Sequence, residues 1–168
     1  LENKIGKIIT AGRKKLDLEN ADKVHKFIKK NKPDVIINCA GKVGGILANN
    51  TYPTEFLNEN IQIQVNLINS AYLNNVKHFI NLGSSCIYPK KSKQPIKESY
   101  LLTGSLEKTN EAYALAKIIG LKMCEFYNSQ YKKSYLTLMP CNLYGPNDNF
   151  DSKNSHFLPA LIKKIITN

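Results

Sequence analysis

The chain lacks several features that mark common classes of protein. No apolar run in its 168 residues approaches the roughly 20 residues that cross a bilayer, so we expect no membrane partner. A signal peptide would begin with a charged stretch followed by an apolar one, and the first residues do not show this pattern. We therefore expect a cytoplasmic protein, and the apolar fraction of 42% is that of a folded domain.

Arginine is nearly absent. Of the 24 basic residues only Arg13 is arginine, although the formal net charge is +11. Nucleic-acid-binding proteins usually gather charge on one face and use arginine for bidentate contacts. Here the lysines are scattered in pairs from Lys14–Lys15 to Lys163–Lys164. We interpret the charge as a solvated basic surface and expect no nucleic-acid partner.

Paired cysteines are missing too. The four cysteines are Cys39, Cys86, Cys124 and Cys141, and they form no C-x-x-C pair. The three histidines add no metal-ligand spacing, so we expect no structural metal and, without a secretory signal, no disulfide framework. Cys86 stands in NLGSSCIYP (81–89), where the residues alone leave open a nucleophile, half of a metal site, a disulfide partner or plain packing.

What the chain does contain is an alternation of short apolar runs, rich in isoleucine and valine, with longer segments of helical period. We predict strands at 5–11, 34–40, 77–85 and 134–140, and helices at 20–31, 53–76, 109–131 and 156–167. Strands that are apolar on both faces and joined by helical crossovers predict an α/β fold with a doubly wound parallel sheet.

Small residues, hydroxyls and amides gather where these strands end. The segments are GRKK (12–15), CAGKVGG (39–45), GSSC (83–86) and CNLYGP (141–146). In open α/β sheets, ligands bind in the crevice outside the carboxyl ends of the strands. The sequence therefore predicts an active site at this edge of the sheet.

Tyr113 and Lys117 are four residues apart in a predicted helix, so their side chains lie on one face. A nearby ammonium stabilises phenolate and is expected to lower the pKa of Tyr113 from its usual value of about 10 toward neutrality. A hydroxyl from GSS (83–85) could hydrogen-bond the same carbonyl oxygen that Tyr113 protonates. An exposed helical Tyr–Lys pair without chemistry is the alternative.

The order of these motifs along the chain resembles that of a known protein family. The stretches concerned are KVGGILANNTYP (42–53), LGSSCIYP (82–89), QPIKESYLLTGSLEKTNEAYALAKIIGLKMCE (94–125), MPCNLYGPNDNF (139–150) and NSHFLPALIKK (154–164). They resemble the extended short-chain dehydrogenases/reductases and, within that superfamily, the GDP-L-fucose synthase family. Y-x-x-x-K marks only the superfamily, whereas the KVGGI, SSCIYP and NSH segments are specific to this family. The resemblance covers most of the chain from about residue 12.

The resemblance implies an NADPH-dependent enzyme that converts GDP-4-keto-6-deoxy-D-mannose to GDP-L-fucose. It assigns Ser84, Tyr113 and Lys117 to reduction at C4, with Tyr113 protonating the oxygen that Ser84 orients. It assigns Cys86 and His156 to epimerisation at C3 and C5. A thiol and an imidazole, with reference pKa values of about 8.5 and 6.5, are suited to exchanging protons near pH 7.

The resemblance also implies an NADP-binding site. Its expected residues are Arg13, Ala40, Leu82, Gly83, Ser84, Ser85, Tyr113, Lys117, Pro140, Cys141, Asn142, Leu143 and His156. Arg13 stands where a 2′-phosphate needs a cation, which favours NADPH over NADH; an ordinary surface charge is the alternative. Lys164 is expected to contact the GDP diphosphate, and Lys42 and Asn49 are further candidates near cofactor and sugar.

The chain also departs from the family. The Gly-rich turn G-x-x-G-x-x-G with which the family opens does not occur in it. We therefore expect a fold truncated at both ends, in which 1–150 forms the NADP-binding domain without its first βα unit and 151–168 begins the substrate-binding region. The family typically dimerises through its two long helices, here 53–76 and 109–131, so a homodimer is expected.

Three alternatives remain. Another nucleotide-sugar epimerase or dehydratase would share the fold, but dehydratases generally carry an acidic pair where this chain has Ser85 and Cys86. A non-catalytic dinucleotide-binding protein would be expected to lose Tyr113 or Lys117, and both are present. A nucleic-acid-binding domain rests on net charge alone.

Overall fold

A parallel three-stranded sheet forms the centre of the protein. The computed structural model describes residues 6–141, 143–150, 155 and 157–167. The strands β1 (Val35–Asn38), β2 (His78–Leu82) and β3 (Ser134–Leu138) lie in the order β1-β2-β3. Their register pairs Ile37 with Ile80 and Ile80 with Leu136, so all three strands end at the same edge. The predicted α/β fold with a parallel sheet is confirmed.

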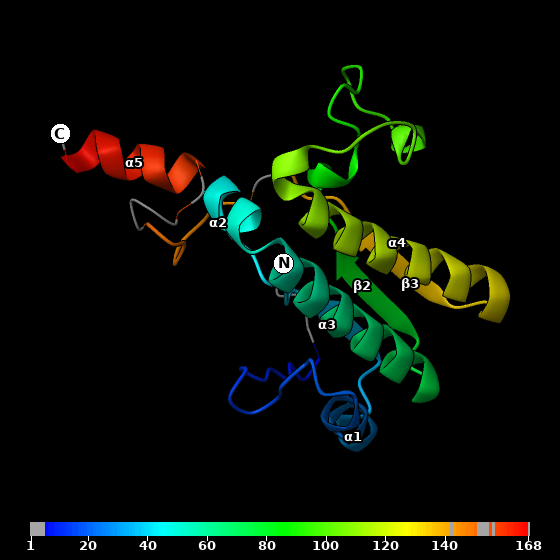
Figure 1. Cartoon of the computed structure of the whole chain (residues 1–168). Coiled ribbons are helices and arrows are strands. Elements are labelled where there is room, and N and C mark those ends of the chain that lie inside the picture. Colours follow the sequence, from blue (N-terminus) through cyan, green and yellow to red (C-terminus); the bar gives the residue numbers. More distant parts are fainter. Residues whose placement is uncertain (1–5, 142, 151–154, 156, 168) are drawn as a thin grey trace.

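Three helices form a layer beside this sheet: α1 (Ala21–Asn31), α3 (Pro53–Leu73) and α4 (Glu111–Tyr131) (Figure 1). In this layer, α3 and α4 contact the strands and α1 packs against α3. Asn20, predicted as the first helical residue, instead caps α1, because its side chain accepts a hydrogen bond from the backbone N–H of Lys23. α3 begins at Pro53 as predicted, since proline is preorganised for the first helical position.

The core lies between this helical layer and the sheet. Val24 and Ile28 from α1, Ile68 from α3, and Phe79 and Tyr135 from the strands are all buried there. Complete burial of an aliphatic or aromatic side chain contributes about 1.5–3 kcal/mol, so this layer supplies most of the packing energy. The long helices are therefore held rigidly over the strands whose ends they overlap.

The opposite face of the sheet is largely bare among the described residues. Val35 and Ile37 on β1 are 45% and 59% exposed, and Leu136 and Leu138 on β3 are 53% and 43% exposed. These apolar side chains alternate along each strand with the buried ones, as the two-residue period requires. The pattern fits a sheet whose second face is also built to be covered, as in a doubly wound fold.

The strand predicted at 5–11 is wrong over residues 6–11, which form no strand. Their isoleucines lie open to solvent, Ile8 at 72% and Ile9 at 38% exposure. A strand needs a hydrogen-bonded neighbour, and the sheet provides none for this segment among the described residues. An apolar run alone could not reveal that.

Sequence periodicity also missed the short elements. They are α2 (Ile46–Thr51) and the 3₁₀ turns η1 (Ser85–Ile87), η2 (Glu98–Tyr100) and η3 (Lys108–Asn110). The last predicted helix is present as α5 (Phe157–Thr167), which extends away from the sheet at the upper left of Figure 1. Among the described helices, none is both long and apolar enough to cross a membrane.

Candidate active site

A cavity of about 520 Å³ opens at the carboxyl ends of the three strands. Its walls come from the segments that follow β1, β2 and β3 and from the first two turns of α4. The lining residues are Cys39, Ala40, Gly41, Val43, Gly44, Gly45, Ile46, Asn49, Leu82, Gly83, Ser84, Ser85, Cys86, Asn110, Tyr113, Lys117, Pro140, Cys141, Leu143 and Asp148. The site therefore lies at the edge that parallel-sheet topology predicts.

The turn after β2 brings two hydroxyls and a thiol to the cavity. Gly83 packs tightly against the end of β3, because an added Cβ would lie 2.5 Å from Met139 Sδ and 3.0 Å from the carbonyl oxygen of Leu138. Ser84 then starts η1, and its Oγ accepts a hydrogen bond from the backbone N–H of Cys86 at 3.4 Å. This tight turn places Ser84, Ser85 and Cys86 side by side in the cavity wall.

Tyr113 and Lys117 line the same cavity from one face of α4, as their spacing predicts. Lys117 is only 5% exposed, and its Nζ donates a hydrogen bond to the carbonyl oxygen of Leu82 at 2.8 Å. The ammonium lies 5.5 Å from the centroid of the Tyr113 ring. Burial lowers the pKa of Lys117, since a low-dielectric site disfavours the charged form.

The pKa of Tyr113 is raised, contrary to the lowering expected from Lys117. Burial is the main cause, the electrostatic interaction with the nearby Cys86 side chain adds to it, and a hydrogen bond with Ser84 partly offsets both. The Lys117 ammonium is committed to the Leu82 carbonyl and approaches the ring of Tyr113. Tyr113 therefore holds its proton at neutral pH, which is the state a proton donor needs.

Cys86 is half-buried and has one hydrogen-bond donor beside it. The side-chain amide Nδ2 of Asn110 donates to Cys86 Sγ at 3.3 Å. His156, predicted to act with Cys86, lies outside the described residues, as does Asn142. The pairing of Cys86 with His156 therefore stays a prediction.

A second, smaller pocket of about 240 Å³ adjoins the first and shares Cys39, Ala40 and Gly41 with it. Here Arg13 forms ion pairs with Glu19 at 2.7 Å and with Glu59 at 3.3 Å. Lys42 also contacts Glu59, at 2.5 Å, and this ion pair lowers the pKa of Glu59. A phosphate at Arg13 would compete with these carboxylates.

Most of the predicted cofactor residues come together, and some do not. Ala40, Pro140, Cys141 and Leu143 line the main cavity with the residues of the β2 turn. Arg13 lies in the smaller pocket instead. Lys164 is exposed in the last turn of α5 and lines none of the pockets described above.

Several lining residues were not assigned individually from the sequence. They are Cys39, Gly41, Val43, Gly44, Gly45, Ile46, Asn110 and Asp148. The segment CAGKVGG (39–45) was predicted to lie at this edge of the sheet, but its residues other than Ala40 and Lys42 were not assigned individually. Asn110 stands at the start of the predicted helix 109–131, and Asp148 lies in a loop without a local signal.

A network of buried side-chain amides connects the strands to α4 next to Lys117. The side chain of Asn38 donates to Asn81, and Asn81 donates to Gln64, at 3.1 and 3.2 Å. Gln64 in turn donates to the carbonyl oxygen of Ala116 at 2.9 Å. The network connects β1 and β2 to the α4 residue before Lys117, so the lysine is held by both its backbone and its side chain.

Comparison with known proteins agrees with this geometry. The model of the NAD dependent epimerase/dehydratase family matches residues 3–168. The chain belongs to that family. It is 51% identical over 157 residues to a GDP-L-fucose synthase of Sinorhizobium fredii, covering 94% of this chain and 50% of that protein.

Solved structures of similar proteins show the same arrangement of elements. A GDP-D-glycero-L-gluco-heptose synthase from Campylobacter jejuni, solved in the presence of NADPH, is 42% identical with a TM-score of 0.89 and covers 93% of this chain and 46% of that chain. A GDP-L-fucose synthetase from Naegleria fowleri bound to NADP is 33% identical with a TM-score of 0.84, covering 95% and 52%. The chain thus spans about half the length of the relatives it matches.

Proposed function

We propose that the protein containing this chain converts GDP-4-keto-6-deoxy-D-mannose to GDP-L-fucose with NADPH. It would invert C3 and C5 and then reduce the C4 ketone. The observation that carries the proposal is one cavity in which a tyrosine, a buried lysine, a serine and a cysteine converge. The GDP-L-fucose synthase from Sinorhizobium fredii, at 51% identity, supports the same substrate.

The two adjoining pockets fit a dinucleotide. The larger contains Tyr113 and Lys117, and the smaller contains Arg13 and Lys42. Gly41 lies where they meet, and an added Cβ would come within 2.8 Å of Asn60 Oδ1, so the backbone there stays bare. A long cleft with a cation at one end and proton donors at the other suits NADPH, whose nicotinamide would supply the hydride to C4.

Reduction needs a proton on the C4 oxygen as its negative charge develops. Tyr113, with its raised pKa, carries that proton at neutral pH and gives it to the oxygen. Ser84 lies in the same cavity wall and donates a hydrogen bond to the same oxygen. Lys117 is fixed by the Leu82 carbonyl and places its positive charge near the phenolate that forms.

Epimerisation uses the same ketone. Removal of a proton from C3 or C5 gives an enolate whose oxygen faces Ser84 and Tyr113. Cys86 would exchange a proton with carbon on one face of the sugar and His156 on the other, so that the returning proton inverts the centre. Cys86 lies in η1, two residues after Ser84, and lines the same cavity, which supports this role.

A homodimer is part of the proposal. Apolar side chains on the outer faces of the two long helices remain open to solvent: Phe126 is 63%, Leu115 41% and Ile119 37% exposed. On α3, Leu57 and Ile61 are half-exposed one turn apart. Sedimentation should show a dimer that Ile119→Lys weakens; a monomer at all concentrations would contradict this arrangement.

The test of the function uses the whole protein with GDP-4-keto-6-deoxy-D-mannose and NADPH. NADPH oxidation is followed by the loss of absorbance of the reduced nicotinamide, and the sugar product is identified by NMR. We expect one NADPH consumed per GDP-L-fucose formed. Reduction without inversion at C3 and C5 would remove Cys86 and His156 from their roles, and sugar interconversion without net NADPH loss would favour a simple epimerase.

A further inference from the structure

Asn110 occupies the N-cap position of α4 but does not cap the helix. Asparagine at this position normally accepts a hydrogen bond from a backbone N–H in the first turn, and Asn20 does so at the start of α1. The side chain of Asn110 makes no such bond. It turns toward the cavity and donates to Cys86 Sγ at 3.3 Å.

The other atom of this amide is also unusual. Asn110 Oδ1 is buried and has no hydrogen-bond partner among the residues that the structure describes. A buried acceptor without a partner costs free energy, and a forgone helix cap adds to that cost. Both costs are explained if the orientation of the amide toward the thiol serves the chemistry of the cavity.

We propose that Asn110 is a positioning residue for Cys86, whose amide N–H holds the sulfur and stabilises its thiolate form during epimerisation. This deepens the proposed function and rests on it. As an acid, Cys86 breaks its S–H bond, gives the proton to the enolate carbon and keeps the electron pair on sulfur. As a base, it starts as thiolate and takes the proton from carbon. Sulfur is negatively charged at one end of either step, and an N–H donor favours that charge.

Thiol reactivity tests the contact without substrate. Iodoacetamide reacts with thiolate, so its rate at Cys86, followed by peptide mass spectrometry, reports the charged form. Asn110→Asp keeps the shape and the N-cap preference but replaces the donor with a carboxylate oxygen, and should slow alkylation of Cys86 roughly tenfold. Asn110→Ala removes the donor without adding charge and should slow it about threefold.

Two controls make the comparison specific. Asn20→Asp introduces the same change at another N-cap and should leave the rate at Cys86 unaltered. Cys39 and Cys141, both exposed, should react equally fast in all variants. If both Asn110 variants alkylate at the wild-type rate, the inference is overturned; if only Asn110→Asp is slow, the added charge and not the lost donor is responsible, and the inference is equally overturned.

Catalysis provides the second readout. In D₂O the protein should incorporate deuterium at C3 and C5, and Asn110→Asp should slow this incorporation about tenfold while the KM for NADPH stays unchanged. Absence of deuterium in the product of the unsubstituted protein would refute the proposed function, whereas the alkylation rates judge the Asn110 contact by themselves. If Asn110→Asp lowers deuterium incorporation and NADPH binding equally, Asn110 has a general structural role and does not position Cys86.

Discussion

The two ends of the sheet each hold a lysine over a tyrosine ring, at nearly equal distances. At the carboxyl end Lys117 Nζ lies 5.5 Å from the ring of Tyr113, and at the amino end Lys133 Nζ lies 5.4 Å from the ring of Tyr72. Only Lys117 is buried and lines a cavity. A Tyr–Lys contact therefore does not make an active site; open space and desolvation around it do.

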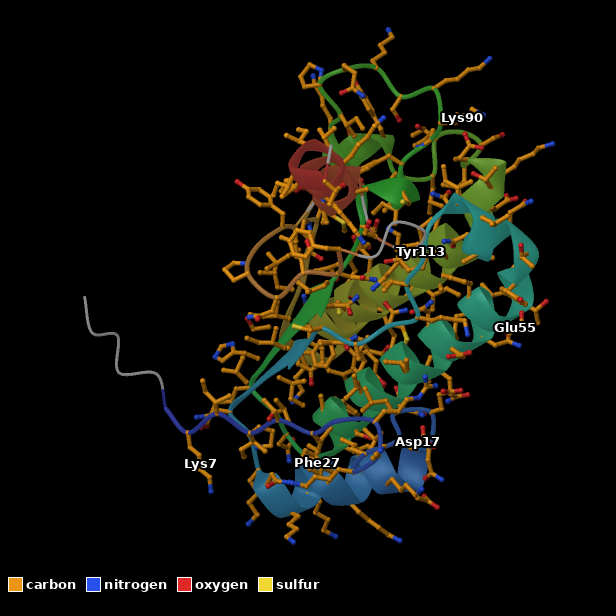
Figure 2. All side chains as sticks on the ribbon, turned by 90° about the vertical axis from the view of Figure 1, so that its left-hand side faces the viewer. Lys7, Asp17, Phe27, Glu55, Lys90 and Tyr113 are labelled. Atoms are coloured by element: carbon orange, nitrogen blue, oxygen red, sulfur yellow. The ribbon has the colours of Figure 1, made fainter. Side chains whose placement is uncertain are left out.

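The amino end is filled instead of open. Tyr72 stacks on Tyr131 with centroids 4.4 Å apart, and Tyr127 lies 5.1 Å from Tyr72 and 6.1 Å from Tyr135. Phe79 lies 5.6 Å from Tyr135 beneath them. Figure 2 shows Tyr113 a little above the middle of the structure and Phe27 of α1 near the lower end. One end of the helical layer is built for chemistry and the other for stability.

Tyr113→Phe should produce the largest effect and should affect chemistry alone. Loss of the proton donor is expected to lower the rate of C4 reduction by about 10²- to 10⁴-fold. The free energy of unfolding should change little, because the ring and its edge contact with Phe56 remain. Single-turnover NADPH oxidation and urea denaturation measure the two quantities. A large loss of stability would contradict the distinction between a catalytic end and a stabilising end of the helical layer.

Phe79→Ala should have the opposite signature. Phe79 is fully buried, and its truncation leaves a cavity beneath the tyrosines. We expect a loss of about 3–5 kcal/mol in the free energy of unfolding. At temperatures where the variant is folded, the KM for NADPH should match that of the unsubstituted protein, and a raised KM would show that the amino end also controls the site.

Gly120→Ala probes the middle of α4, between the two ends. An added Cβ would collide with Gln64 Oε1, a member of the amide network beneath Lys117. Overpacking of this kind costs about 1–3 kcal/mol. We expect both the stability and the affinity for NADPH to fall, as measured by thermal unfolding and by titration of the cofactor. Loss of stability with unchanged affinity would show that the amide network does not position Lys117.

Tyr127→Phe should cost about 1 kcal/mol, because it removes the hydrogen bond from the tyrosine hydroxyl to Asn69 Oδ1 and keeps the ring. Urea denaturation measures the change. Tyr131→Phe is the matched control in the same cluster. The Tyr131 hydroxyl accepts an exposed hydrogen bond from Gln130, so its removal should cost less. An equal cost for both substitutions would show that the Asn69 contact adds no specific stability.

Tyr135→Phe should have the smallest effect at neutral pH and a clear one in alkali. Burial raises the pKa of Tyr135 to about 12, against 10 in the unfolded chain. Because the folded state favours the protonated phenol, this contribution to stability is complete below pH 10 and is lost as the pH rises from 10 to 12. The free energy of unfolding should therefore decrease less between pH 8 and pH 11 for Tyr135→Phe than for the unsubstituted protein. An equal decrease in both proteins would contradict the raised pKa of Tyr135.

Local sequence patterns located the parts of the site accurately. The positions of β2 and α4 followed from an apolar run and a helical period, and parallel topology then placed Ser84, Tyr113 and Lys117 at one edge. These inferences succeed because periodicity and strand ends are local properties of the chain. The failed strand at 6–11 shows the limit, since a strand exists only with a neighbour.

The sequence by itself determined which residues could do chemistry and on which elements they stand. Only the tertiary structure decided how they are charged and held. It turned Asn110 from a helix cap to the thiol, raised the pKa of Tyr113 by burial, and engaged Arg13 with two carboxylates. The physical reason is that pKa values and hydrogen-bond choices depend on solvent exclusion and on partners distant in the chain, and neither is written in local spacing.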